Sequence, residues 1–192
     1  MPSSPKISKQ LMIETAFEIL SQDGYSMLNI KAVANKIGCS TQPISRHFGS
    51  MDGLRRELLD YSIERLHSFF RLEGECVQDI IEGIANGYIT LAFDHPNLYK
   101  YFYMSESDGE RMQIVTQSLR SINYNKILEM FATEYNMSAS SANNFIENMS
   151  FYVHGIASYV AVGYVSLTKE EVMKRIHKTM QTLLLETTDC TN

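Results

Sequence analysis

Five hydrogen-bonding side chains fall within seven consecutive positions near the N-terminal end of this chain. They are Thr41, Gln42, Ser45, Arg46 and His47. On a short helix these positions face outward, while Ile44 and Phe48 face inward. Hydroxyl, amide, guanidinium and imidazole groups form hydrogen bonds with base edges and phosphates in the major groove of DNA. The set therefore predicts a surface that binds double-stranded DNA.

The elements that must position this surface are two short helices joined by a turn with a glycine. The first is expected over residues 30–37, after capping residues 26–29, and Gly38 ends it. Ser40 or Thr41 can cap the second, and Pro43 is tolerated in its first turn. Residues 49–50 break the chain after this second helix, which indicates a helix-turn-helix.

An inward face and a preceding helix complete the predicted N-terminal unit. Val33, Ala34 and Ile37 are expected to pack against Ile44 and Phe48, and the small Ala34 allows close approach. A further helix ends at Gly24, and its apolar stripe is expected at Leu11, Ala16, Phe17, Ile19 and Leu20.

The charge of the chain is divided unevenly. The whole sequence carries a net charge of −5. Residues 1–56 hold seven basic and four acidic residues, which is a net +3, and the remainder carries −8. The asymmetry places any contact with a polyanion in the N-terminal part.

Residues 7–60 resemble the TetR family. The matching features are the helix that ends at Gly24, the segments 30–34 and 38–40, and residues 44–48, followed by Leu54 after a serine-containing break. The resemblance implies an all-α fold, with a three-helix DNA-binding head (residues 1–50), an all-helical body (residues 51–192) and about nine helices. It also implies a homodimer on a pseudo-palindromic operator, and a repressor that releases DNA when a small molecule enters the body.

We expect the DNA contacts to come from the following head residues: Asn29, Lys31, Thr41, Gln42, Pro43, Ser45, Arg46 and His47. Three positions depart from the usual pattern of the family. Ser45 stands where the family usually has a tyrosine, Met51 where it usually has a lysine, and Pro43 where many members have a small or polar residue. Arg46, His47 and two further arginines at 55 and 56 are available to supply the missing contacts.

Beyond the head, helical periodicity continues to the end of the chain. Helices are expected over residues 52–72, 77–93, 97–105, 109–135, 139–164 and 169–187. We expect the two units to divide inside the first of these. The last two carry apolar stripes, part of which should be buried in a partner chain: Phe145, Met149, Tyr152, Ile156 and Val160, then Val172, Ile176, Met180, Leu183 and Leu184.

Aromatic residues and methionines are dense between positions 93 and 112. A core stripe explains any one of them, whereas the set favours the lining of a ligand pocket. Residues 152–157 resemble a tract in the ligand-binding region of some TetR-like proteins. The expected ligand contacts are Phe93, Tyr99, Phe102, Tyr103, Met112, Tyr124, Phe151 and His154. Such residues suit a small hydrophobic or aromatic effector, or a cationic one.

Other functional classes fit the sequence less well. It has no Ser-His-Asp order, Gly-rich phosphate loop or metal-ligand cluster, so we expect no enzyme, no cofactor and no metal. Three scattered cysteines suit a reducing compartment, and no stretch predicts a membrane span, so a cytoplasmic protein is expected. The alternative is a helical adaptor for proteins, whose helix-turn-helix does not bind DNA.

Overall fold

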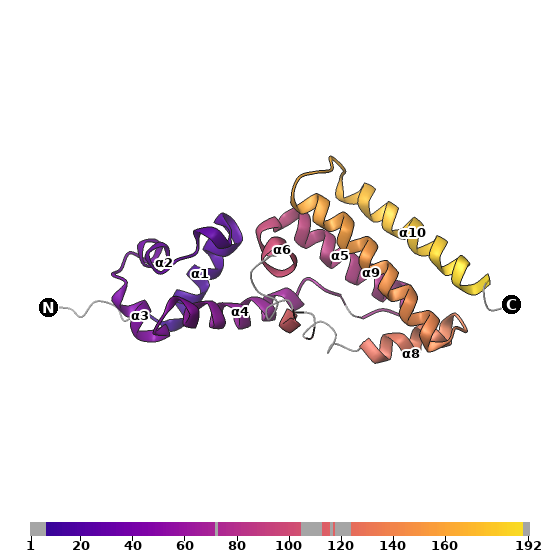
Figure 1. Cartoon of the computed structure of the whole chain (residues 1–192), viewed down its shortest axis with the longest axis horizontal. Coiled ribbons are helices and arrows are strands. Elements are labelled where there is room, and N and C mark those ends of the chain that lie inside the picture. The colour runs from indigo at the N-terminus through magenta and orange to yellow at the C-terminus, as the bar shows by residue number, and fades with distance from the viewer. Residues whose placement is uncertain (1–6, 72, 105–112, 116, 118–123, 190–192) are drawn as a thin grey trace. The chain divides into compact units, whose positions relative to one another are not determined.

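The computed structural model describes residues 7–71, 73–104, 113–115, 117 and 124–189 (Figure 1). Nine α-helices and one short 3-10 helix lie within these residues, and no strand does. The chain divides into two compact units, residues 1–66 and residues 67–192. The expected all-α class is thus confirmed, and the division falls inside the fourth helix, at its last turn.

The first unit contains α1 (Lys9–Asp23), a 3-10 helix (Tyr25–Met27), α2 (Ile30–Ile37), α3 (Gln42–Phe48) and nearly all of α4 (Met51–His67). Ser8 begins α1 by accepting a hydrogen bond from the backbone N–H of Leu11 at 3.1 Å. Gly38 ends α2 in the left-handed conformation, with φ of 81°, which side chains other than glycine rarely adopt. At this turn the chain changes direction between α2 and α3.

The core of the first unit is apolar and closely packed. Its fully buried side chains come from all four helices: Met12, Ala16, Leu20, Val33, Ile44, Leu54 and Leu58. The stripe expected on α1 is therefore partly wrong. Leu11 lies on the exposed side, and Met12 and Ile13 occupy the buried face instead, because the helix packs on α2 and α3 through the face that contains Ala16 and Ile19.

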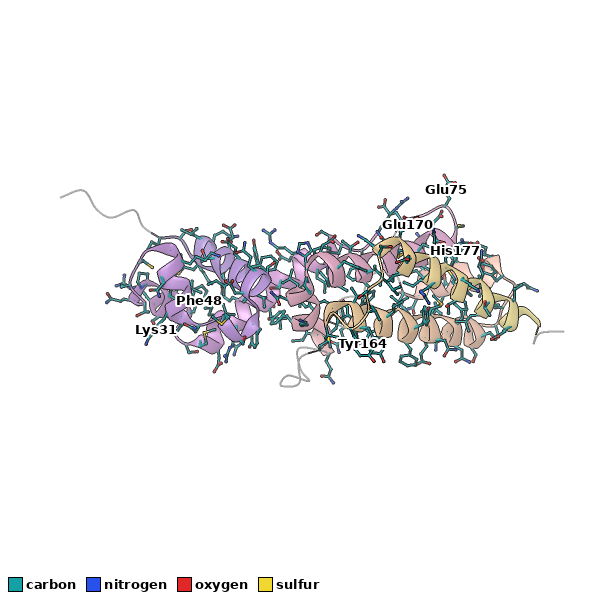
Figure 2. The ribbon with its side chains drawn as sticks, turned by 90° about the horizontal axis from the view of Figure 1, so that it is seen from above. Lys31, Phe48, Glu75, Tyr164, Glu170 and His177 are labelled. Carbon is teal, nitrogen blue, oxygen red and sulfur yellow. The ribbon has the colours of Figure 1, made fainter. Side chains whose placement is uncertain are left out.

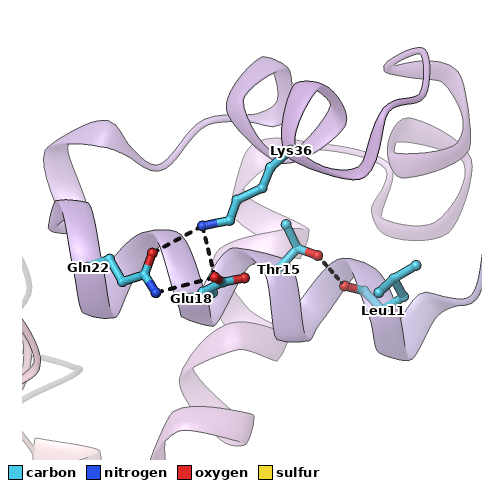
Figure 3. A network of polar contacts seen from close by, with 5 residues as sticks. All are labelled: Leu11, Thr15, Glu18, Gln22 and Lys36. Carbon is cyan, nitrogen blue, oxygen red and sulfur yellow. Dashed lines mark hydrogen bonds and ion pairs between the residues drawn. The ribbon is translucent and has the colours of Figure 1, made fainter.

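A polar clamp holds α2 against α1 (Figure 3). The Lys36 ammonium lies 3.1 Å from the Glu18 carboxylate and donates a hydrogen bond to the Gln22 side-chain oxygen at 3.3 Å. Nearby, the Thr15 hydroxyl donates to the backbone carbonyl of Leu11 at 2.7 Å. Lys36 thus has a structural task within the unit.

The second unit is formed by α5 (Val77–Asp94), α6 (Pro96–Tyr103), α8 (Tyr124–Glu134), α9 (Ala139–Ala161) and α10 (Lys169–Asp189). Helices α5, α9 and α10 pack against one another, α6 packs on α5 and α9, and α8 packs on α9 and α5. Figure 1 shows α9 and α10 side by side. None of the described helices is long and apolar enough to cross a membrane.

The ends of several helices differ from expectation. Helix α4 ends at His67, short of the expected residue 72, and the segment after it lies against α5. Two glycines of α5 make this possible, because a Cβ at Gly83 or Gly87 would lie within 2.6 Å of the backbone oxygens of Arg71 and Phe69. Of the helix expected over 109–135, several N-terminal residues lie outside the described part of the chain.

The apolar stripes of α9 and α10 are used mainly inside the chain. Phe145, Met149, Val172, Ile176 and Met180 are all buried in the single chain, so these five are not the part of the stripes that is left for a partner. Their burial follows from the mutual packing of α5, α9 and α10. The other five members of the two stripes, at positions 152, 156, 160, 183 and 184, are half-buried.

Candidate functional site

The structure places the polar residues of α3 on one accessible surface. Thr41, Gln42, Ser45, Arg46 and His47 are all exposed, and Pro43 is half-buried in the first turn. Ile44 and Phe48 turn inward and anchor the helix in the core. Thr41 precedes the helix but forms no capping hydrogen bond with its side chain, so the hydroxyl stays accessible.

The described lysines and arginines of the first unit fall into two groups. Lys9 lies 2.6 Å from Glu57 and above the Phe48 ring, Lys36 belongs to the clamp, Arg55 lies 3.0 Å from Asp52, and Arg65 donates a hydrogen bond to the Tyr61 hydroxyl. Three others, Lys31, Arg46 and Arg56, are exposed and form no ion pair or hydrogen bond within the described residues. Figure 2 shows Lys31 on the surface of this unit. The unpaired cations therefore come from α2, α3 and α4.

Asn29 begins α2 rather than simply lying on the surface. Its side-chain oxygen accepts a hydrogen bond from the N–H of Ala32 at 2.9 Å, and its amide nitrogen donates to the carbonyl of Met27 at 3.1 Å. The side chain is exposed but both of its polar atoms have partners. A contact with phosphate would thus have to use the remaining amide hydrogen.

In the second unit, a polar and aromatic cluster joins α5, α6 and α9. The Tyr99 hydroxyl lies 3.2 Å from Nδ1 of His154 and 3.1 Å from the Ser158 hydroxyl, and donates to the carbonyl of His154 at 3.1 Å. The Tyr103 ring contacts the rings of Tyr88, Tyr99 and His154, with centroids 5.1, 5.1 and 5.3 Å away. This aromatic cluster is Tyr88, Tyr99, Tyr103, His154 and Ser158.

Burial sets the ionisation of the cluster. Desolvation raises the pKa of Tyr99 to about 12 and raises the pKa of Tyr88 and Tyr103 as well. The same cause lowers the pKa of His154 below its usual 6.5. All four side chains are thus neutral at pH 7.

One polar atom of the cluster has no partner. The Tyr103 side chain is only 8% exposed, and its hydroxyl is buried without a hydrogen bond to any described residue. The Tyr88 hydroxyl is near enough to influence the pKa of Tyr103, but the two groups do not meet the geometric limits of a hydrogen bond. Buried hydroxyls without partners are rare in folded proteins.

Most of the remaining residues expected at a ligand lie outside the cluster. Phe102 is buried on α6 with its ring 6.2 Å from the Tyr103 ring, centroid to centroid, and Phe93 is half-buried on α5, but neither shares the polar contacts of the cluster. The Tyr124 hydroxyl donates to Asn143 at 2.8 Å. Phe151 is 68% exposed and makes no ring contact with the cluster, and Met112 lies outside the described residues.

Sequence reasoning missed Tyr88 and Ser158. Tyr88 lies outside the aromatic-rich stretch between positions 93 and 112. Ser158 follows His154 by one helical turn, and this spacing is the signal that could have found it.

A second surface of interest is the outward face of α9. Phe151, Tyr159 and Val162 are 68%, 55% and 49% exposed, and Gly155 lies between the first two. A Cβ added at Gly155 would meet no atom within 4 Å, so this glycine leaves the face open. The spacing puts Phe151, Gly155 and Tyr159 on one stripe of the helix, and Val162 directly follows its last residue.

Comparison with known proteins points to one family. Residues 12–58 match the family described as bacterial regulatory proteins of the tetR family. A helix-turn-helix transcriptional regulator of Mycobacterium tuberculosis is 26% identical over 107 residues, which are 55% of this chain and 49% of the relative. The match thus spans about half the length of that relative.

Solved structures share the fold over nearly the whole chain. A TetR-like transcriptional regulator from Rhodococcus sp. RHA1 has a TM-score of 0.57 at 16% identity, with 96% of each chain covered. A flavonoid-responsive regulator has a TM-score of 0.53 at 15% identity, with 92% of this chain and 95% of that chain covered. At these identities the likeness concerns the fold.

Proposed function

We propose that this chain, whose residues 12–58 match the tetR family of bacterial regulatory proteins, is a dimeric, cytoplasmic transcriptional repressor that binds a pseudo-palindromic DNA operator and releases it when a small molecule binds the body. The observation that carries this proposal is the surface of α3. Five hydrogen-bonding side chains are exposed there on a helix that Ile44 and Phe48 anchor.

The unpaired cations of the head support DNA as the partner. Arg46 on the reading helix is free to form a bidentate contact with guanine or with a phosphate. Lys31 and Arg56 flank it in the sequence on α2 and α4 and suit phosphates. In this proposal Thr41, Gln42 and Ser45 approach base edges, and Asn29, Pro43 and His47 border the groove.

The body supports a small molecule as the signal. Its aromatic cluster combines rings with a few polar atoms, which is the usual composition of a ligand site. Tyr99, Tyr103 and His154 are the members that the sequence predicts as ligand contacts. The solved relative that is described as flavonoid-responsive supports a small-molecule signal in this fold.

The outward face of α9 supports the dimer. Large apolar side chains exposed along one stripe are typical of an interface. A two-fold dimer would place two heads on successive major grooves, roughly 34–36 Å apart. Ligand binding would change the separation of the heads through α4 and so weaken the fit to the operator.

The test of DNA binding uses the full-length chain and fragments of its source genome. Selected fragments should bind with an affinity that falls steeply with salt, because the phosphate contacts release counterions. Binding that does not change between low and physiological salt would contradict the proposal. A chain that binds no DNA but captures a protein would instead establish the helical adaptor.

Arg46→Ala and Phe48→Ala form a matched pair for this test. Arg46→Ala should cost roughly 1–3 kcal/mol of operator binding at one base pair if the contact is to guanine, with the melting temperature unchanged. A phosphate contact would instead weaken all sequences alike. Phe48→Ala should cost about 3–5 kcal/mol of head stability and lower DNA binding by unfolding. Unchanged affinity in Arg46→Ala would remove this residue from the site.

A further inference from the structure

The aromatic cluster leaves two polar positions open. The Tyr103 hydroxyl is buried without a hydrogen bond to any described residue. His154 uses Nδ1 toward Tyr99, and no described residue forms a hydrogen bond with its Nε2. The rings of Tyr103 and His154 are 5.3 Å apart, centroid to centroid, so both residues belong to the same packed cluster.

Unlike Tyr103, Tyr99 has hydrogen-bond partners for its hydroxyl within the cluster. Its hydroxyl is one helical turn from that of Tyr103 on α6 and has three polar atoms within 3.2 Å. A phenol has one donor and two acceptor positions, so Tyr99 has little capacity left. Of the two phenols, Tyr103 is the one that is available to a ligand.

The lack of charge in the cluster limits the chemical classes of ligand that it could bind. The shifts in the pKa values of Tyr88, Tyr99, Tyr103 and His154 arise from burial and from one another or Ser158, and no described Asp, Glu, Lys or Arg contributes to them. A carboxylate or ammonium brought to this place would lose its water and meet no opposite charge among the cluster's described neighbours. A neutral group with an oxygen would gain hydrogen bonds without that penalty.

We propose that this cluster is the polar end of the effector site, and that the effector is an uncharged aromatic molecule whose hydrogen-bonding oxygen pairs with the Tyr103 hydroxyl. The inference rests on the proposed function only in assuming that the body binds a small molecule. The aromatic part of the effector packs against ring edges and faces of the cluster. Of the hydrophobic, aromatic or cationic effectors that the sequence predicts, this proposal keeps the neutral ones and excludes the cationic ones.

Four probes with one bicyclic body test the proposal by calorimetry on the full-length protein. They are acetylnaphthalene, ethylnaphthalene, naphthoate and trimethylnaphthylammonium, all substituted at the same ring carbon. The ketone should bind about tenfold more tightly than the hydrocarbon, because it forms one additional hydrogen bond. The two charged probes should bind more weakly than the ketone by at least the same factor.

Two variants locate the effect. Tyr103→Phe should remove the advantage of the ketone over the hydrocarbon and leave the affinity for the hydrocarbon unchanged. Tyr135→Phe is the matched control, since it loses a phenol that stacks on Phe131, away from the cluster. It should keep the preference of the unaltered protein. A general loss of folding would lower the affinity for both probes equally, which separates a damaged fold from a lost hydrogen bond.

Three results would overturn the inference. The first is binding of a charged probe as tightly as the ketone. The second is binding of none of the four probes. The third is a preference for the ketone that survives in Tyr103→Phe.

DNA binding is measured separately, without any probe. A chain that binds no DNA but shows the preference dependent on Tyr103 would contradict the repressor and support the site. A chain that binds DNA but none of the probes would do the opposite.

Discussion

Two tyrosines four residues apart on α6 have opposite surroundings. The Tyr99 hydroxyl has partners in His154 and Ser158, and the Tyr103 hydroxyl has none among the described residues. Tyr99→Phe should lower the free energy of unfolding by about 1–3 kcal/mol, because buried partners are left unpaired. Tyr103→Phe should leave it unchanged or raise it, because a buried unpaired hydroxyl is removed. Urea denaturation of both variants measures the difference, and equal losses would show that Tyr103 has a structural partner.

His154 should make the stability of the second unit depend on pH. Burial lowers the pKa of its imidazole, so protonation is less favourable in the folded than in the unfolded chain. The free energy of unfolding should therefore be highest above about pH 6.5, the pKa of histidine in the unfolded chain, and it should fall as the pH drops below that value. His154→Gln should remove part of this fall between pH 7 and 5. The exposed His47→Gln is the control, and identical pH profiles for the two variants would contradict the prediction.

At the scale of elements, the beginning of α2 connects head stability with DNA binding. Asn29→Ala removes the cap on the N–H of Ala32 and should cost about 1 kcal/mol of head stability. Asn29→Asp keeps the capping oxygen and adds a negative charge, so it should retain the melting temperature and weaken DNA binding. Thermal melting and operator affinity measured on both variants separate the two roles. Full affinity in Asn29→Asp would place residue 29 away from the phosphates.

Local signals made the helix-turn-helix predictable. The bounds of α2 match the expected residues 30–37, because an Asn cap and a left-handed glycine mark its two ends within the sequence itself. The outward polar set of α3 follows from the same short-range pattern, and all five side chains are exposed. The Ser138 cap of α9 was predictable in the same way, since its hydroxyl accepts from the N–H of Ser141.

Long-range packing limited the prediction in the body. The apolar positions of α9 and α10 repeat with the period of a helix whether they face another helix of the same chain or a partner. Periodicity alone therefore could not tell that Phe145 and Ile176 belong to the part of the stripes that the chain itself buries, by packing of α5, α9 and α10. The aromatic cluster depends on contacts between helices far apart in the sequence, such as that of Tyr99 with His154, 55 positions away, and only its members on α6 and α9 were predictable.

For the molecule as a whole, the outward face of α9 decides whether two heads act together. Phe151, Tyr159 and Val162 would lie in water if the chain were a monomer, and their burial against a second copy would stabilise a dimer through the hydrophobic effect. Tyr159→Asp would force a charge into that interface. Sedimentation at micromolar concentration should then change from dimer to monomer.

Tyr159→Asp should also weaken DNA binding, because a monomer loses the avidity of two linked heads. A monomer presents one head, so operator affinity should fall by about a hundredfold, since the second head no longer binds from a high effective concentration. Lys126→Ala is the matched control, because it makes the same change in net charge at an exposed position of α8. It should sediment as a dimer and bind the operator normally. If the Tyr159→Asp variant remains a dimer with full operator affinity, the two chains must associate through another surface. The exposed apolar residues on the face of α9 would then need a different explanation.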